Sequence, residues 1–386
     1  MVRSMKQITG GVCAVRGVRA YGIKENKNGL AVITGSGASS GVFTRNKIIA
    51  APLTLTRTHL ADKHKLEAII ANSGCANAFT GARGLSDARR MAELLADRLG
   101  VEKDAVGVAS TGVIGVPLDL NWIEDHIDSV IARLSDTQDG STASARAIMT
   151  TDTRPKEFAV ELPSGVRIGG IAKGSGMIAP DMATMLAFIY TDADISHEML
   201  DSCLRQAVDH SFNMIVVDGD TSTNDMVLLT ATAENGELDE KEFQEGLDRV
   251  CIELATMIVR DGEGAEKFIE ARVTGAKTEE DAKNAAKAIV RSPLVKTAVH
   301  GSDPNWGRVI AAAGYSGALV DPDQISLALC GTLLVDHGMV VDSAGVDMSG
   351  NDIEIALDLG LGTGEAVAWG CDLTAEYVRI NAEYTS

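Results

Sequence analysis

Apolar side chains recur at helical spacing in several segments of the chain. The first segment lies between Ser86, whose side chain favours a helix N-cap, and Gly100, which favours a helix end. Its apolar face consists of Met91, Leu94, Leu95 and Leu99. The same spacing predicts helices around residues 123–134, 199–207 and 243–258, and a further helix that begins at Thr278.

Short apolar runs between glycines and turn residues predict β-strands between these helices. The expected strands are Leu30–Thr34, Val42–Ala51, Leu66–Ala71, Val106–Ala109, a hairpin over residues 157–174, the run 185–190, and two strands around Val216 and Leu228. From Ser326 onward the sequence is mostly strand and turn. Because strands and helices do not alternate with βαβ regularity, the pattern favours an α+β fold of layered helices and sheets over a doubly wound sheet.

Composition narrows the class of protein. The chain has 386 residues, of which 45% are hydrophobic and 23% charged, as is typical of a globular protein with one large or two ordinary domains. The formal net charge is −19. Because nonspecific nucleic-acid binding depends on neutralising phosphates, such binding is not expected. An anionic substrate would need positive side chains placed locally, since salt screens the overall negative field within about 8 Å.

The cysteines and the apolar runs indicate where the protein works. The six cysteines are dispersed, with no C-x-x-C pair and no Cys/His cluster at zinc spacing, so reduced and buried thiols are expected. The N-terminus has no apolar signal-peptide region, and no apolar stretch is long enough to span a bilayer. The sequence therefore predicts a soluble, cytoplasmic protein.

The segment from Lys173 to Ala193 carries the strongest candidate chemistry. A loop rich in Gly and Pro ends at Ala183, and Thr184 opens an apolar run typical of a buried strand. If the Ala183–Thr184 bond were cut, Thr184 would carry a hydroxyl nucleophile and a free α-amine that could serve as its base. A Thr at the start of a strand is more often only a β-former. The nearby Lys173, and Pro180 within the loop, favour the functional interpretation.

Two further segments are candidates for chemistry. At a strand end, Thr111 and Gly112 could direct a hydroxyl and a backbone N–H at a developing oxyanion, although an ordinary tight turn explains them equally well. The acidic run Asp218–Asp225 suggests calcium, but Thr223 and Leu229 stand where an EF-hand loop needs Gly and Glu. A turn rich in side-chain-to-backbone hydrogen bonds is the preferred interpretation.

Other motifs give little support to other chemistries. The Gly-rich runs Gly35–Ser40 and Gly360–Glu365 lack the last glycine of a dinucleotide-binding fingerprint, and no P-loop is present. His300 begins a His-Gly-Ser-Asp run, but neighbours in sequence do not make a catalytic triad. This run is predicted to be a turn that leads into a helix near Trp306. Neither a cofactor nor a metal is expected.

Together, these motifs resemble the arginine biosynthesis bifunctional protein family, the ornithine acetyltransferases (glutamate N-acetyltransferases). The resemblance runs from near residue 6 to the C-terminus. The matching motifs are Gly41–Thr44 with Ala50–Pro52, Asn72–Ala78, Ser110–Gly115, Thr150–Thr153, Lys173–Leu186, Asp218–Asp225, Asp261–Ala265, His300–Arg308 and Asn381–Tyr384.

The resemblance implies both a fold and a processing event. The fold is a layered, N-terminal-nucleophile-like sandwich of helices and sheets with a smaller C-terminal lobe. An inactive precursor would cleave itself at Ala183–Thr184 into an α-chain of residues 1–183 and a β-chain of residues 184–386, which fold together as one unit. Two such pairs would form an α2β2 heterotetramer.

The resemblance also assigns residues to the site. Thr184 is the nucleophile, and the oxyanion hole maps to Thr111 and Gly112. Substrate contacts map to Thr151, Lys173, Thr184, Glu263, Asn381 and the terminal Ser386. The alignment leaves open whether Thr150 or Thr151 is the contact, and Ser386 stands where some members end in Thr.

The implied reaction moves an acetyl group from N2-acetylornithine to glutamate through an acyl-enzyme in a ping-pong cycle. Three questions stay open: whether acetyl-CoA is also a donor, which group is the base for self-cleavage, and whether the enzyme is feedback-regulated. The alternatives are a self-processed amidase or aminopeptidase that uses water as the acceptor, and a non-catalytic binding protein in which the Thr184 loop is only structural.

Overall fold

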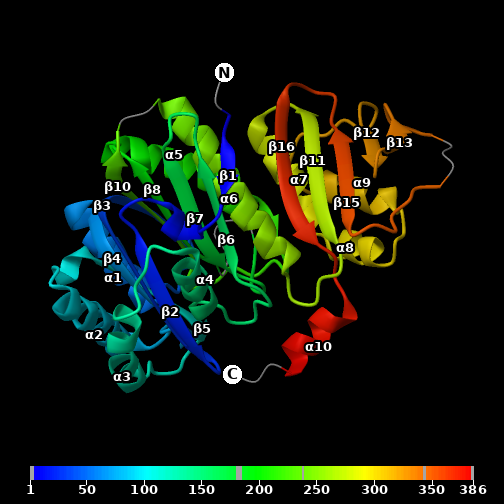
Figure 1. The fold of residues 1–386 in the computed structure, drawn as a ribbon. Coiled ribbons are helices and arrows are strands. Elements are labelled where there is room, and N and C mark those ends of the chain that lie inside the picture. Colours follow the sequence, from blue (N-terminus) through cyan, green and yellow to red (C-terminus); the bar gives the residue numbers. More distant parts are fainter. Residues whose placement is uncertain (1–3, 180–184, 237–238, 342–344, 384–386) are drawn as a thin grey trace.

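The computed structural model describes residues 4–179, 185–236, 239–341 and 345–383, which form two lobes, each built on a mixed β-sheet (Figure 1). The large sheet contains β1 (Lys6–Ile8), β2 (Arg19–Glu25), β3 (Asn28–Phe43), β4 (Lys65–Cys75), β5 (Val106–Val113), β6 (Lys156–Glu161), β7 (Arg167–Lys173), β8 (Leu186–Ala193) and β10 (Met226–Asn235). The smaller sheet contains β9 (Ile215–Val216), β11 (Phe268–Ala276), β12 (Ser326–Leu329), β13 (Thr332–Asp336), β14 (Met339–Val340), β15 (Asp352–Asp358) and β16 (Gly364–Cys371). The α-helices are α1 (Ala51–Lys63), α2 (Gly81–Leu99), α3 (Leu120–Ile131), α4 (Gln138–Ala147), α5 (His197–Asp209), α6 (Glu240–Arg260), α7 (Glu279–Arg291), α8 (Pro293–His300), α9 (Trp306–Gly314) and α10 (Ala375–Glu383).

The large sheet has the strand order β1-β6-β7-β8-β10-β3-β4-β5, with β2 paired to β3. The pairs β8–β10 and β4–β5 are parallel, and the other pairs are antiparallel. Helices α5 and α6 pack on β3, β6, β7 and β10, and α1 and α2 contact β5. Every residue of β8 is buried, because this central strand has a packed core on both faces. Burial on both faces explains why the run after residue 185 is continuously apolar rather than alternating.

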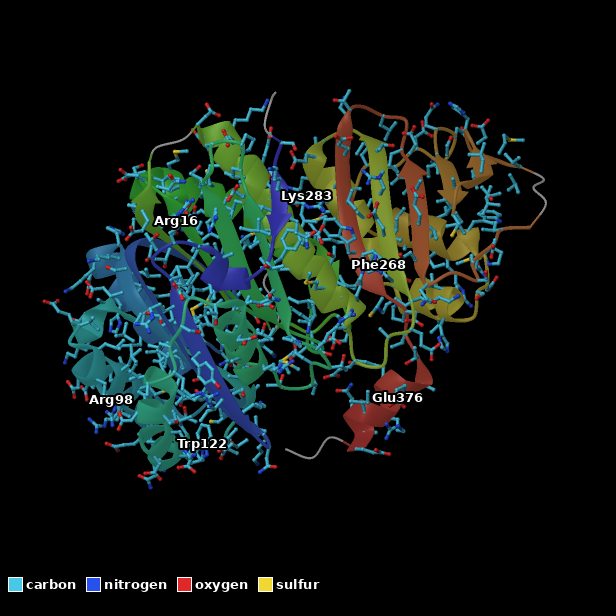
Figure 2. The ribbon with its side chains drawn as sticks, viewed as in Figure 1. Arg16, Arg98, Trp122, Phe268, Lys283 and Glu376 are labelled. Carbon is cyan, nitrogen blue, oxygen red and sulfur yellow. The ribbon has the colours of Figure 1, made fainter. Side chains whose placement is uncertain are left out.

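The smaller lobe has the strand order β14-β13-β12-β15-β11-β16-β9, and α7 covers β11 and β16. Apolar residues of α6, β11 and α7, such as Leu254, Ile269 and Ile289, belong to one continuous core that joins the lobes. Lys283 of α7, labelled in Figure 2, forms an ion pair of 2.5 Å with Asp209 at the end of α5. The predicted α+β fold with layered helices and sheets and a smaller C-terminal lobe is confirmed.

Two of the predictions for the N-terminal part were wrong. The predicted strand Val42–Ala51 stops at Phe43, and α1 begins at Ala51. Pro52 explains the change, because proline lacks an N–H and fits the first turn of a helix, where that group would have no partner. The next helix, α2, begins at Gly81 rather than after Ser86, but it ends at Gly100 in a left-handed conformation as expected.

The expectation that the cysteines are reduced and buried is largely confirmed. All six cysteines are free thiols; four are buried, whereas Cys75 and Cys330 are half-buried. None of the helices in the described parts of the chain combines the length and apolar character needed to cross a membrane.

Candidate active site

The ends of β5 and β7 meet at one place, although four strands separate them in the sheet. Thr111 near the end of β5 is buried, and its hydroxyl accepts a hydrogen bond of 3.3 Å from the Lys173 ammonium at the end of β7. Gly112 follows with φ of +134°, and its backbone lies against Gly74 of the paired strand β4. Only glycine fits there, because a Cβ on Gly112 would lie 2.4 Å from the Gly74 carbonyl carbon.

Lys173 supplies a local cation in a protein of strongly negative net charge. Its side chain is only 2% exposed, and its Nζ lies 4.0 Å from Oδ2 of Asp152. Burial lowers the pKa of Lys173, and the neighbouring Asp152 carboxylate opposes that effect. Burial would raise the pKa of Asp152, but Lys173 and Lys156 outweigh it, so that pKa lies below its ordinary range.

A cavity of about 400 Å³ opens between these strand ends and the loops around them. It is lined by Thr111, Gly112, Val113, Ile114, Thr150, Thr151, Lys173, Gly176, Met177, Glu263 and Asn381. The cavity thus brings together six of the residues singled out in the sequence, which come from five separate parts of the chain. Thr150 and Thr151 both line it, so this lining does not distinguish between them.

Glu263 and Asn381 also line the cavity and contact each other. The Asn381 side chain on α10 donates a hydrogen bond of 2.9 Å to Oε2 of Glu263. The Glu263 backbone N–H donates to the Ser175 carbonyl at 2.9 Å. A Cβ on Gly176 would lie 2.4 Å from the Glu263 carboxylate, so glycine at this position allows the carboxylate to approach the loop. The Glu263 carboxylate therefore lies close to the loop that follows Lys173.

Ala183, Thr184 and Ser386 lie outside the described residues. The chain resumes at Met185, whose backbone N–H donates a hydrogen bond of 3.0 Å to Oδ1 of Asp225. Asp225 is fully buried, and its Oδ2 has no hydrogen-bond partner in the parts of the chain that the structure describes. Burial raises the pKa of Asp225 to about 8.

The acidic run Asp218–Asp225 is a hydrogen-bonded loop, as the sequence favoured. Asp218 accepts hydrogen bonds from the backbone N–H groups of Met177 and Ile178 at 2.6 and 2.9 Å. The Asn224 side chain donates to the carbonyl of Ser110 at 2.8 Å. The loop thereby joins the chain after Lys173 to the strand that carries Thr111.

His300 belongs to a different place. It ends α8, its Nδ1 lies 2.9 Å from Oδ2 of Asp372, and neither residue lines the cavity. The predicted turn after His300 and the predicted helix at Trp306 are confirmed. His300, Asp372 and Glu266 are close enough to share a metal ion, but Asp372 already accepts two backbone N–H groups at 2.9 Å. A metal would therefore compete with existing hydrogen bonds.

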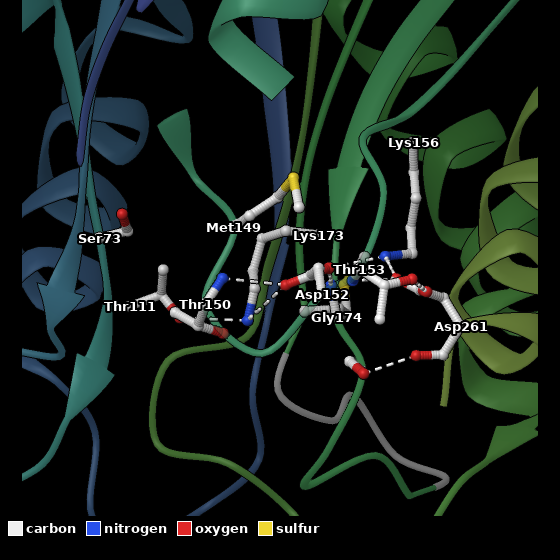
Figure 3. A network of polar contacts seen from close by, with 12 residues as sticks. Ser73, Thr111, Met149, Thr150, Asp152, Thr153, Lys156, Lys173, Gly174 and Asp261 are labelled. Carbon is white, nitrogen blue, oxygen red and sulfur yellow. Dashed lines mark hydrogen bonds and ion pairs between the residues drawn. The ribbon is translucent and has the colours of Figure 1, made fainter. Parts of the chain in front are cut away.

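Three buried residues of the site were missed in the sequence. Figure 3 shows Lys156 between two carboxylates, with Nζ 2.7 Å from Asp152 and 2.5 Å from Asp261. Asp152 lies within the quoted Thr150–Thr153 motif and Asp261 begins the Asp261–Ala265 motif, so both acids were visible in sequence. Lys156 carried no signal there, because a Lys at the start of a strand is usually exposed.

The comparisons identify the family. The model of the ArgJ family matches residues 15–386, and the chain therefore belongs to the ArgJ family, an enzyme family. It is 55% identical to the glutamate N-acetyltransferase of Methanosarcina mazei, over 99% of this chain and 100% of that protein. It is 47% identical to the arginine biosynthesis bifunctional protein ArgJ of Symbiobacterium thermophilum, over 98% of this chain and 100% of the relative. A solved ArgJ structure from Bacillus halodurans is 43% identical, covers 51% of this chain and 98% of its own, and has a TM-score of 0.48.

The raised pKa of Asp225 predicts a pH-dependent stability. An unfolded aspartate has a pKa of about 4. Between that pH and about 8, the folded protein binds one proton more than the unfolded chain, so this group lowers stability as the pH rises through the interval. Asp225→Asn, which cannot ionise, should therefore gain stability relative to wild type as the pH rises from about 5 to about 8. Thermal unfolding midpoints of both proteins across this range test it, and a difference that is constant with pH would contradict it.

Proposed function

We propose that this chain is a glutamate N-acetyltransferase that moves the acetyl group of N2-acetylornithine to glutamate in arginine biosynthesis. The observation that carries this proposal is one cavity that is lined by six of the candidate residues of the sequence. Those residues are Thr111, Gly112, Thr151, Lys173, Glu263 and Asn381. The relative that is 55% identical over nearly the whole chain bears the name of this activity.

The proposal begins with self-cleavage at Ala183–Thr184. The Thr184 hydroxyl attacks the Ala183 carbonyl carbon, the C–N bond breaks, and the nitrogen takes the proton, which leaves an ester. Water then hydrolyses the ester and frees residues 1–183 from residues 184–386. Two observations support this step: Met185, the residue after Thr184, is held by the Asp225 carboxylate, and β8 and β10 of the second part lie between strands of the first part in one sheet. That interleaving would keep the two chains together after cleavage.

Acetyl transfer would use the same hydroxyl. With an ordinary pKa of about 8, the freed α-amine can accept the hydroxyl proton near neutral pH. The oxygen attacks the acetyl carbonyl of N-acetylornithine, and donors at Thr111 and Gly112 stabilise the oxyanion. Ornithine leaves with the proton on its nitrogen. The amine of glutamate then attacks the acetyl-enzyme, and N-acetylglutamate is released as the Thr184 hydroxyl re-forms.

Charge in the cavity suits amino-acid substrates. Lys173 would bind a substrate carboxylate, and the Glu263 carboxylate would bind an ammonium group of the substrate. Both residues line one cavity and carry opposite charges, which supports this division of roles. An α2β2 assembly is included in the proposal on the family resemblance alone, and a cytoplasmic location on the six free cysteines, since disulfides are rare in the reducing cytosol.

A double-substrate experiment tests the function. The purified protein is incubated with N-acetylornithine and ¹⁵N-glutamate, and the products are measured by mass spectrometry. We expect ¹⁵N-labelled acetylglutamate and ornithine in equal amounts, with little free acetate. Acetate release that does not depend on glutamate would instead indicate an amidase. Replacing N-acetylornithine by acetyl-CoA in a parallel sample measures the second possible donor.

A further inference from the structure

Four buried charged groups run in a line in the order Lys173, Asp152, Lys156 and Asp261 (Figure 3), and of these only Lys173 lines the cavity. Their side chains are between 0% and 3% exposed. Charges buried to this degree are costly unless each has a partner of opposite sign. Two ammonium groups and two carboxylates alternate here, so the line is neutral as a whole.

Asp152 is the member of this line that hydrogen-bonds to backbone next to residues that line the cavity. Its Oδ1 accepts hydrogen bonds from Lys156 at 2.7 Å and from the Gly174 backbone N–H at 2.7 Å. Its Oδ2 accepts a hydrogen bond of 3.0 Å from the Thr150 backbone N–H and faces Lys173. One carboxylate thus fixes the residue after Lys173 and the start of the Thr150–Thr151 pair.

Asp261 links Lys156 to the loop that carries Glu263. Its carboxylate accepts hydrogen bonds from the Lys156 ammonium at 2.5 Å and from the Thr153 backbone N–H at 3.1 Å. Its backbone carbonyl accepts a hydrogen bond from the Ser175 hydroxyl at 2.5 Å. Glu263 follows two residues later. The line of charges therefore connects Lys173 to the loop of Glu263, and both of these residues line the cavity.

Lys173 has no other acidic partner as close as Asp152 among the described residues. Its Nζ forms an ion pair with Asp152 and donates a hydrogen bond to the neutral Thr111 hydroxyl. The charges that also act on it are Lys156, Lys24, Asp225 and Glu263. Two of these are cations, which favour the neutral amine. Without Asp152, burial and these two cations would lower the pKa of Lys173 further.

We propose that Asp152 is a positioning residue that keeps Lys173 charged and oriented to bind a substrate carboxylate, and that Lys156 is the cation that balances Asp152. The inference rests on the proposed function, because it takes Lys173 as the group that meets the substrate. It assigns to Asp152 an effect on substrate affinity, exerted through Lys173, rather than contact with the substrate itself.

Asp152→Asn is the direct test, because asparagine has the same shape and its amide oxygen can still accept one backbone N–H. KM for N-acetylornithine and for glutamate is measured from about pH 6 to about pH 9 and divided by the wild-type value at each pH, so that titration of the substrate cancels. We expect KM to rise about 10- to 100-fold at neutral pH, the range expected when a hydrogen bond to a charged group is lost. The ratio should fall toward the acid end, where Lys173 regains its proton.

A second substitution separates charge from structure. In Asp152→Asn/Lys156→Met, the cation that repels Lys173 is removed together with the carboxylate, so the double variant should recover part of the lost affinity. Loss of two packed residues would otherwise impair the protein further. Thermal unfolding confirms that each variant is folded at the assay temperature. A KM ratio that is equal at every pH, or a double variant no better than Asp152→Asn, would overturn the inference.

Lys173→Met distinguishes this inference from the function on which it rests. If Lys173→Met leaves KM for both substrates unchanged, the proposed role of Lys173 fails, and the role of Asp152 fails with it. If Lys173→Met raises KM while Asp152→Asn behaves as wild type at every pH, only the inference about Asp152 is overturned.

Discussion

Thr184→Ala is expected to give a single uncleaved chain without acetyl-transfer activity. The substitution removes the hydroxyl that would attack the Ala183 carbonyl during processing and the acetyl group during transfer. Loss of a nucleophile typically lowers turnover about 10⁴-fold or more. The intact-mass spectrum under denaturing conditions should show two fragments that meet at Ala183/Thr184 in wild type and one full-length mass in the variant.

Thr184→Ser is the matched control, since it keeps a hydroxyl at the same position and removes one methyl group. This variant should be cleaved at the same bond and should retain measurable transfer. Cleavage of Thr184→Ala at the wild-type rate would refute the role of the hydroxyl. Active wild-type protein with only a full-length mass would do so equally, and would direct attention to a different nucleophile.

The elements that could be predicted from the sequence are those with a clear local pattern, such as a periodic apolar face or a turn. The helix over residues 243–258 and the hairpin over 157–174 appear as α6 and as β6–β7, since periodic apolar faces and a turn at Pro163–Gly165 are local features. Helix α1 was missed because its apolar residues do not form one face of the helix. Leu53 and Leu55 are two residues apart and pack in different cores. Such a segment has no helical periodicity to detect.

The site was partly predictable for a different reason. Motifs indicated Thr111, Lys173 and Glu263 one at a time, but their meeting in one cavity depends on the order of strands in the sheet, which no local pattern specifies. Asp152 and Asp225 lie in motifs that the sequence analysis singled out, but no local pattern indicated that these two carboxylates are buried. Their importance follows from burial and from the neighbours that burial imposes.

Gly112→Ala is expected to lower acetyl transfer about 10²- to 10³-fold, the usual effect of losing one oxyanion donor. A Cβ at this position would lie 2.4 Å from the carbonyl carbon of Gly74 and 2.6 Å from the backbone nitrogen of Cys75. Both contacts are with backbone, so β4 and β5 must separate before the methyl group fits. The φ of +134° adds strain of about 1–3 kcal/mol for a residue with a side chain. Displacement by even part of an ångström would move the N–H of residue 112 away from the developing oxyanion.

Gly115→Ala provides the control for backbone strain alone. Gly115 also has a positive φ, +84°, but a Cβ there would have no atom within 4 Å. The variant Gly115→Ala should lower the unfolding midpoint with little effect on kcat. The variant Gly112→Ala should lower both the unfolding midpoint and kcat. Steady-state kinetics and thermal unfolding of the two variants, measured side by side, separate the two effects. Equal kcat values in Gly112→Ala and Gly115→Ala would show that the close contact with Gly74 is not what positions the strand end, and would remove Gly112 from the proposed oxyanion hole.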